Sequence, residues 1–217
     1  MAHIIVILGA PGTGKGTQAR ALAQTTGCPL ISVSRLQEDI AWSATLLGHA
    51  APAGAEVLTD ERLMQSIETR TSQPDCDDGY ILDGWPNTLR QAQMLEELAT
   101  RQGHDILVYR LNATPAALMK RLNGRRVCQH CGESYNTWLR PPVAQGRCDL
   151  CGQPPGLRDY ESEAMLQSRL NRWQQSAEPV MNHFRQSGRL VELNAERPVE
   201  EVFYDLCSSA TGLTCGA

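Results

Sequence analysis

The chain has 217 residues, of which 41% are hydrophobic and 20% charged, and its formal net charge is −4. These values are ordinary for a soluble globular protein, and the length fits one domain with an insertion or two. The acidic balance argues against a broad role on nucleic acids or on membrane surfaces. The first apolar run, Ile4–Leu8, is too short for a membrane span or a secretory signal, so we expect a cytoplasmic protein.

Short β-branched runs alternate with helical stretches, the pattern of an α/β fold with a parallel sheet. Five segments are predicted as strands: His3–Leu8, Pro29–Val33, Tyr80–Asp83, Ile106–Leu111 and Leu190–Leu193. Helices are predicted at Thr59–Arg70, Thr114–Arg126, Glu161–Gln186 and Pro198–Ser209. A threonine cap opens each of the first two, and Pro179 is expected to kink the third.

Two segments interrupt this alternation. Gly48–Glu56 is rich in small residues and is predicted to be a loop inside an insertion. Val127–Tyr160 contains two Pro-Pro pairs and several glycines, so we expect an irregular, separate knuckle there rather than a core element.

The segment Gly9–Thr17 (GAPGTGKGT) follows a buried strand and opens a helix. Its glycines let successive backbone N–H groups point inward, and the helix adds the positive end of its dipole. Lys15 supplies a point charge for the β- and γ-phosphates of a nucleotide. The flanking strand and helix favour this phosphate site over a chance glycine-rich turn. The predicted contacts are Gly12, Thr13, Gly14, Lys15, Gly16 and Thr17.

Four of the eight cysteines form two Cys-x2-Cys pairs with sixteen residues between them. This spacing favours a structural zinc site with no open position, over two disulfides or an iron–sulfur centre. A nucleic-acid-binding ribbon is another interpretation of the cysteine-containing segment, but the segment is not notably basic. The predicted ligands are Cys128, Cys131, Cys148 and Cys151. The isolated cysteines are predicted to be buried or free thiols: Cys28, Cys76, Cys207 and Cys215.

Several motifs together resemble the adenylate kinases and related nucleoside monophosphate kinases. They are the phosphate loop GAPGTGKGTQ, the strand end Tyr80–Pro86 (YILDGWP), Gly124-Arg125-Arg126, and the arginines Arg158 and Arg169. The resemblance implies a three-layer P-loop fold with a five-stranded parallel sheet over residues 1–217. It also implies an acceptor-binding insertion at 32–60, a zinc-bearing hinged lid at 127–160, and a monomer that uses Mg-ATP.

Phosphoryl transfer requires in-line positioning and compensation of negative charge. Arg121 and Arg125 are four residues apart on one predicted helix, so both are expected to project from one face. Asp83, at the carboxyl end of a strand, is placed to organise Mg²⁺ through water. A solvated helix face is the alternative for any single arginine.

The family resemblance assigns further roles to these basic residues. It places Arg121 near the adenine, and it places Arg125, Arg158 and Arg169 near the phosphates. Arg197, just before Pro198, stands where the family's backbone touches adenine.

The acceptor side departs from the family pattern. Where the family usually reads Ile-Ser-Thr-Gly-Asp-x-x-Arg, residues 31–38 read ISVSRLQE, so Glu38 replaces a phosphate-binding arginine. Asn87 replaces a second arginine, while Gln91, which would read the acceptor base, remains. Each loss removes charge-assisted hydrogen bonds worth about 1.5–3 kcal/mol. Arg35 or Arg90 is a candidate substitute, although Arg90 is equally a candidate for a solvated helix residue.

The family's paired aspartates after the lid are also changed, to Tyr160 and Glu161.

Three functions remain open. The first is an adenylate kinase (ATP + AMP = 2 ADP) with rewired acceptor contacts. The second is a kinase of another nucleotide, a nucleoside or a small alcohol. The third is a nucleotide-binding regulatory protein with little turnover, which the presence of Lys15 and Asp83 argues against.

Overall fold

The computed structural model describes residues 2–37, 59–156 and 163–209. The chain divides into two compact units. The first unit comprises Met1–Gly9, Gly14–Asn112 and Ser176–Ala217, and the second comprises Ala10–Thr13 and Ala113–Gln175. The second unit therefore extends beyond the segment 127–160 that the sequence marks as a lid. Among the described residues, no helix has the length and apolar character needed to cross a membrane.

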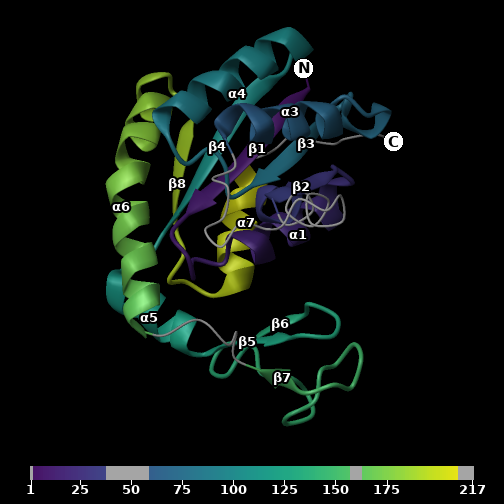
Figure 1. The fold of residues 1–217 in the computed structure, drawn as a ribbon, viewed down its shortest axis with the longest axis vertical. Helices are drawn as coiled ribbons and strands as arrows, with labels where there is room; N and C mark the ends of the chain where they lie inside the picture. Colours follow the sequence, from purple (N-terminus) through teal and green to yellow (C-terminus); the bar gives the residue numbers. More distant parts are fainter. Residues whose placement is uncertain (1, 38–58, 157–162, 210–217) are drawn as a thin grey trace. The chain divides into compact units, whose positions relative to one another are not determined.

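A five-stranded parallel sheet forms the centre of the first unit (Figure 1). Its strands are β1 (His3–Gly9), β2 (Leu30–Ser32), β3 (Gly79–Asp83), β4 (Asp105–Asn112) and β8 (Leu190–Asn194). The order across the sheet is β2-β3-β1-β4-β8, so β1 lies in the middle. The side chains of Ile4 to Ile7 are almost completely buried there. The five predicted strands are confirmed to within two residues, but Val33 begins a helical stretch, 33–37, instead of ending β2.

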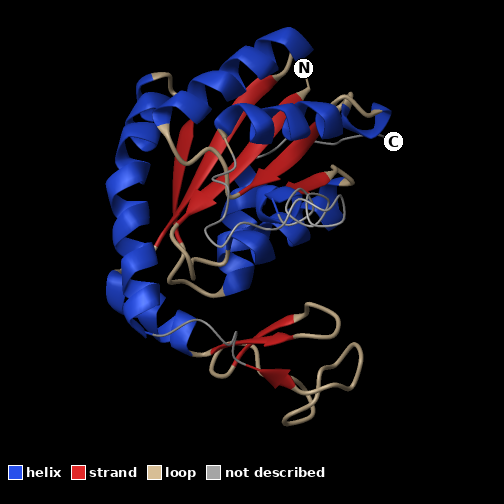
Figure 2. Ribbon diagram, viewed as in Figure 1, coloured by secondary structure: helices blue, strands red, loops and turns tan. Residues whose placement is uncertain are grey.

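Helices cover both faces of this sheet, giving three layers (Figure 2). The helices of the first unit are α1 (Lys15–Thr26), α3 (Asp60–Thr71), α4 (Leu89–Gln102) and α7 (Val199–Ser209), with the short 3₁₀ helix η1 (Pro74–Cys76). α1 and α7 pack against each other on one face, and α3 and α4 pack together on the other. Right-handed crossovers between the parallel strands produce this distribution.

The sequence prediction gave no bounds for α4, although it considered Arg90 as a helix residue. Thr88 caps this helix by accepting a hydrogen bond from the backbone N–H of Gln91, and Gly103 ends it with a φ of 69°. Its buried face consists of Gln91, Ala92, Leu95, Leu98 and Ala99. The spacing of these small and branched apolar residues is helical, so the signal was present but masked by the polar residues between them.

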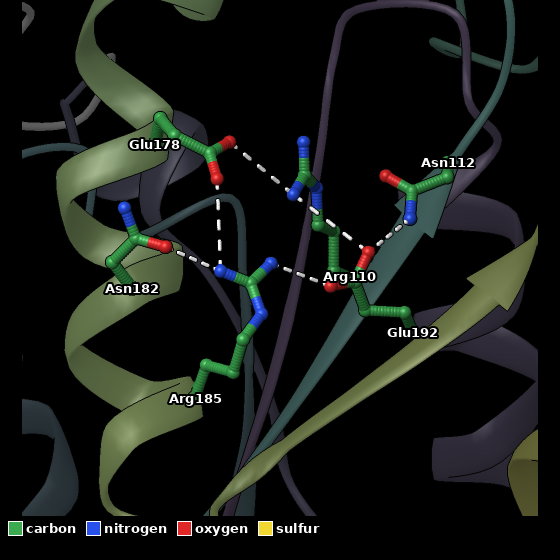
Figure 3. Close-up of polar contacts among 6 residues, drawn as sticks. All are labelled: Arg110, Asn112, Glu178, Asn182, Arg185 and Glu192. Carbon is green, nitrogen blue, oxygen red and sulfur yellow. Dashed lines mark hydrogen bonds and ion pairs between the residues drawn. The ribbon is translucent and has the colours of Figure 1, made fainter.

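α6 (Glu163–Gln186) belongs to both units and continues without interruption past Pro179. Its part in the first unit joins β4 and β8 through a network of charged groups (Figure 3). Arg185 lies 2.6 Å from Glu192 of β8, and Glu178 lies 3.4 Å from Arg110 of β4. Asn112 donates a hydrogen bond to Glu192 at 2.6 Å. These groups come from three elements, and together they hold the end of α6 on the sheet.

The second unit contains α5 (Pro115–Asn123), the first part of α6, and a three-stranded antiparallel sheet. The sheet consists of β5 (Arg125–Cys128), β6 (Ser134–Asn136) and β7 (Pro155–Gly156), with β5 in the centre. The segment that was expected to be irregular therefore contains short strands, and the rest of its described residues lie in turns and loops. Apolar side chains from α5, α6 and the phosphate loop form its core: Ala10, Leu118, Leu122, Leu166 and Leu170.

The prediction of one helix over Thr114–Arg126 was also wrong, because α5 ends at Asn123. The ring of Trp138 lies so close to Gly124 that a Cβ there would be 2.4 Å from it. The Asn136 side chain donates to the Arg121 carbonyl at 2.8 Å, satisfying a carbonyl of the last helical turn. The β5–β6 hairpin thus ends the helix, and Arg125 becomes the first residue of β5.

The isolated cysteines have different states. Cys76 and Cys207 are free thiols, as predicted. Cys28 is buried, as predicted, but it takes part in a disulfide. Isolation in the sequence did not indicate this bond, because sequence spacing says nothing about distance in the fold.

Some predictions fall outside the described residues: those for Gly48–Glu56, Glu38, Arg158, Tyr160, Glu161 and Cys215.

Candidate active site and metal centre

The start of α1 forms one part of the phosphate loop. Gly14 has a φ of 93°, a left-handed conformation that favours glycine, and stands directly before the helix. The backbone N–H groups of Thr17 and Gln18 both donate to the Gly14 carbonyl at 3.0 Å. Lys15 is the first residue of the helix. This turn therefore presents a helix N-terminus and an ammonium group at the carboxyl end of β1.

The remaining loop residues, 10–13, belong to the second unit. Gly12 has a φ of 90°, and a Cβ on it would lie 3.1 Å from Cγ of Leu122 and 3.3 Å from the Leu118 carbonyl. Conformation and close packing on α5 thus both require glycine at this position. Thr13 is buried, and its hydroxyl donates to the Ala10 carbonyl at 2.9 Å.

Asp83 ends β3 and pairs in register with Ile7 of β1. Its Oδ2 lies 3.3 Å from the point that a Cβ of Gly16 would occupy, so the carboxylate faces the first turn of α1. Burial raises the pKa of Asp83, and the positive charges of Lys15 and Arg20 oppose that rise. Arg20 had not been predicted as a site residue. Its four-residue spacing from Gly16 on α1 was the one available signal.

The carboxylate of Asp83 is a fitting group for Mg²⁺. No described residue donates a hydrogen bond to it. An anionic oxygen that accepts no hydrogen bond from the described residues, beside a phosphate loop, has the hard character that Mg²⁺ prefers, either directly or through water.

The predicted acceptor residues Asn87 and Gln91 lie close together at the start of α4. The Gln91 side chain accepts a hydrogen bond from the Asn87 backbone N–H and donates one to Asp60 of α3, both at 2.7 Å. The Asn87 side chain donates to the Gly84 carbonyl at 3.0 Å. Both side chains therefore have protein partners, and Gln91 holds the starts of α3 and α4 together.

The two arginines considered as substitutes differ in their surroundings. Arg90 forms an exposed ion pair with Glu61 of α3. Arg35 lies on the helical stretch after β2, is exposed, and forms no hydrogen bond or ion pair within the described part of the chain. Of the two, Arg35 has its charge available to a ligand.

The other predicted arginines lie on separate elements. Arg121 is on α5, Arg125 on β5 and Arg169 on the first part of α6, all in the second unit. The expectation that Arg121 and Arg125 share a helix face was wrong, because the helix ends between them. Arg197, in the first unit, forms ion pairs with Glu201 and Asp205 of α7. Its side chain is therefore occupied by protein partners.

The four paired cysteines form a compact cluster in the second unit, with all sulfur atoms within 4.8 Å of one another. Two sulfur–sulfur distances, Cys128–Cys151 and Cys131–Cys148, are 3.4 Å. A tetrahedral zinc ion with Zn–S bonds of about 2.3 Å needs sulfurs about 3.8 Å apart, so the cluster fits zinc. All four are free thiols, so the structure contradicts two disulfides.

The two halves of the cluster repeat one backbone turn. Gly132 donates to the Cys128 carbonyl and Gly152 to the Cys148 carbonyl, both at 2.8 Å. These glycines have φ values of 76° and 74°, which a larger residue would adopt with strain. Each Cys-x2-Cys pair therefore directs both sulfurs to one side of its turn.

Polar groups around the cluster favour the thiolate form of Cys148. Burial raises the pKa of Cys148, but hydrogen bonds from the Tyr135 hydroxyl and from the backbone N–H groups of Cys151 and Leu150 outweigh it, and the pKa falls to about 6. Tyr135 is itself held by the backbone N–H of Asp149 at 2.7 Å. Thiolates are the form that binds zinc.

Comparison with known proteins agrees with this geometry. Residues 7–189 match the family model described as adenylate kinase. The chain is 35% identical over 208 residues to the adenylate kinase of Thermodesulfovibrio yellowstonii, covering 94% of this chain and 97% of the relative. It is 36% identical over 202 residues to that of Moorella thermoacetica, covering 91% and 93%. For that of Methanocella arvoryzae the identity is 34% over 205 residues, with 93% and 95% covered. The chain therefore belongs to the adenylate kinase family and is a phosphotransferase of the nucleoside monophosphate kinase type.

Proposed function

We propose that the chain transfers the γ-phosphoryl group of ATP to a nucleoside monophosphate, AMP being the first candidate, through an acceptor site that differs from the family pattern. One observation carries the proposal: Lys15 and Asp83 meet beside the first turn of α1, at the carboxyl ends of β1 and β3. Parallel α/β sheets bind their ligands at this edge.

On the donor side, the loop 9–17 would hold the ATP phosphates with its backbone N–H groups, and Lys15 would contact the β- and γ-phosphates. Transfer of a phosphoryl group depends mainly on position and charge, so Lys15 need exchange no proton. Asp83 would hold Mg²⁺ through water. Bound in this way, Mg²⁺ neutralises charge on the β- and γ-phosphates.

On the second unit, we assign Arg121 to the adenine of ATP, and Arg125 and Arg169, with Arg158, to the phosphates. The continuous α6 carries Arg169, and the β5–β6 hairpin carries Arg125. The cysteine cluster would bind one structural zinc ion and hold this hairpin together, because the strands are too short to supply a core of their own. Segment 127–160 would act as a lid that excludes water during transfer.

On the acceptor side, segment 32–60 would bind the monophosphate, with Gln91 reading its base. Asn87 supports the claim of an altered site, because its side chain is neutral and donates to the Gly84 carbonyl. Glu38 adds a negative charge to the same segment. We therefore expect AMP to bind more weakly than ATP.

The test is an acceptor panel. Mg-ATP is supplied with AMP, CMP, UMP, GMP, the corresponding nucleosides or buffer alone, and ADP release is followed. Lys15→Met serves as the blank. We expect turnover with AMP at a KM well above the KM for ATP. A micromolar KM for AMP would contradict the altered acceptor site. If none of the acceptors supports turnover, a regulatory protein that only binds nucleotide is favoured.

The neutral side chain at position 87 also favours a second candidate, a kinase whose acceptor has no phosphate. Faster turnover with a nucleoside than with its monophosphate would select this candidate. Zinc analysis is independent of both: we expect one zinc per chain, and a folded second unit without metal would contradict the zinc assignment.

A further inference from the structure

The two halves of the cysteine cluster differ in one side chain. In each half, the first cysteine accepts hydrogen bonds from the backbone N–H groups two and three residues further along the chain. The second cysteine of each half accepts one from the N–H group two residues further along. Besides the cysteines, one described side chain also hydrogen-bonds a sulfur of the cluster. It is Tyr135, whose hydroxyl oxygen lies 3.2 Å from Sγ of Cys148.

Burial and strand pairing fix the position of Tyr135. It is the middle residue of β6 and pairs in register with Arg126 of β5. Its side chain is buried in one cluster with Cys128 and Cys148. The guanidinium of Arg140 lies over its ring, with Cζ 5.8 Å from the ring centroid. The hydroxyl is therefore held beside the sulfurs by packing on the ring, and its bond to Cys148 is buried.

The direction of the bond to Cys148 follows from counting protons. The backbone N–H of Asp149 donates to the Tyr135 hydroxyl oxygen at 2.7 Å. A cysteine that binds zinc has lost its S–H proton. The only hydrogen left between the two side chains is then the one on the tyrosine oxygen. Tyr135 therefore donates to the Cys148 thiolate, and a hydrogen bond to an ionised group is stronger than a neutral one.

Such a bond matters because of the charge of the loaded cluster. Four thiolates outweigh the two positive charges of Zn²⁺, so the cluster with its metal is negatively charged. A donor on one sulfur draws off part of this charge and fixes the orientation of the ligand. Partners of this kind, outside the ligands themselves, commonly change metal affinity about 10–100-fold.

We propose that Tyr135 is a positioning residue of the metal centre, whose hydroxyl holds the Cys148 thiolate in place and thereby retains the zinc. This inference rests on the zinc site of the proposed function and is independent of the phosphoryl transfer. It also gives β6 a role beyond pairing, because Tyr135 joins the β5–β6 hairpin to the second cysteine turn through Cys148 and Asp149.

The experiment compares Tyr135→Phe with the wild type. The change keeps the ring and removes only the hydroxyl. Tyr80→Phe is the matched control, because Tyr80 is also buried and its hydroxyl donates to Gln102 at 2.9 Å, in the first unit. Competition with a chromophoric chelator gives the Kd of zinc. Absorption of the Co²⁺-loaded proteins reports on the sulfur–metal bonds, and thermal melts establish that each variant is folded.

We expect Tyr135→Phe to raise the Kd of zinc about 10–100-fold. The sulfur-to-cobalt charge-transfer bands should move to longer wavelength, because a thiolate that has lost a hydrogen bond is a better electron donor. The cobalt site should stay tetrahedral. Tyr80→Phe should leave the Kd and the spectrum unchanged.

Two results would overturn the inference alone. The first is a zinc Kd within about threefold of the wild type. The second is weaker binding with an unchanged cobalt spectrum, which would mean that the hydroxyl supports only the backbone turn at Asp149. A wild type that binds no zinc would overturn the zinc site and this inference together. If the wild type binds zinc as expected but phosphorylates no acceptor, the transfer fails and the role of Tyr135 stands.

Discussion

The two substrate regions of the first unit are built in opposite ways. At the donor region, the Asp83 carboxylate faces the first turn of α1, and no described residue donates a hydrogen bond to it. At the acceptor region, Gln91 and Asn87 are hydrogen-bonded to protein partners. The ligand of the donor region could therefore be inferred from the residue types in the sequence. At the acceptor region the polar groups are hydrogen-bonded to one another, so its ligand can be inferred only from unpaired charges nearby.

Removal of the donor ammonium should have the largest effect. Lys15→Met is expected to lower turnover by about 10²–10³-fold, because the variant loses charge compensation for the transferring group. Initial rates with Mg-ATP and AMP measure the loss, and a thermal melt checks the fold. Residual turnover within a few-fold of wild type would show that the donor region does not depend on this charge.

Asp83→Asn should reduce turnover by about 10–100-fold, the usual cost of losing an outer contact to a metal. The same change should raise the melting temperature. Burial raises the pKa of Asp83, so the folded state binds its proton more tightly than the unfolded chain. The ionised group therefore destabilises the fold at neutral pH, and this cost declines as the pH falls through the raised pKa. A lower melting temperature for Asp83→Asn at pH 7 would contradict this account.

Loss of a zinc ligand should have a smaller effect on turnover, because the first-unit residues of the donor region stay intact. Cys148→Ser is expected to remove the metal and to lower the melting temperature of the second unit. Metal analysis and calorimetry measure both. Cys207→Ser is the matched control, since Cys207 is a free thiol outside the cluster. Full zinc content in Cys148→Ser would disprove the four-cysteine site.

Restoring charge at the acceptor region should strengthen AMP binding. Asn87→Arg is expected to lower the KM for AMP about tenfold, through one new charge-assisted hydrogen bond, and to leave the KM for ATP unchanged. The lost bond to the Gly84 carbonyl is exposed and should cost little stability. An unchanged KM for AMP would mean that position 87 does not face the acceptor phosphate.

The smallest expected effect comes from releasing Arg90. Glu61→Gln removes its partner, and exposed ion pairs of this kind contribute at most about 1 kcal/mol to stability. We expect a decrease of about twofold or less in the KM for AMP and no change in melting temperature. A larger decrease would show that Arg90, once released, substitutes for the lost arginines.

The sequence predicted the sheet and the donor residues well, because their signals are local. The run Ile4–Leu8, the glycines after it and the Cys-x2-Cys pairs each determine structure within a few residues. The end of α5 was mispredicted because it depends on Trp138, fourteen residues further along the chain. The network of Arg110, Glu178 and Glu192 joins three elements that are distant in the sequence, so no short sequence pattern predicts it. Arg20 could not be predicted as a site residue, because its place in the site depends on the Asp83 carboxylate, which lies on another element.

The stoichiometry of the reaction tests the central claim most directly. Wild-type protein is incubated with Mg-ATP and AMP, and all three adenine nucleotides are quantified over time. The account predicts two ADP formed for each AMP consumed, and both changes about 10²–10³-fold slower with Lys15→Met. ADP formed without consumption of AMP, or at the same rate when AMP is omitted, would contradict it.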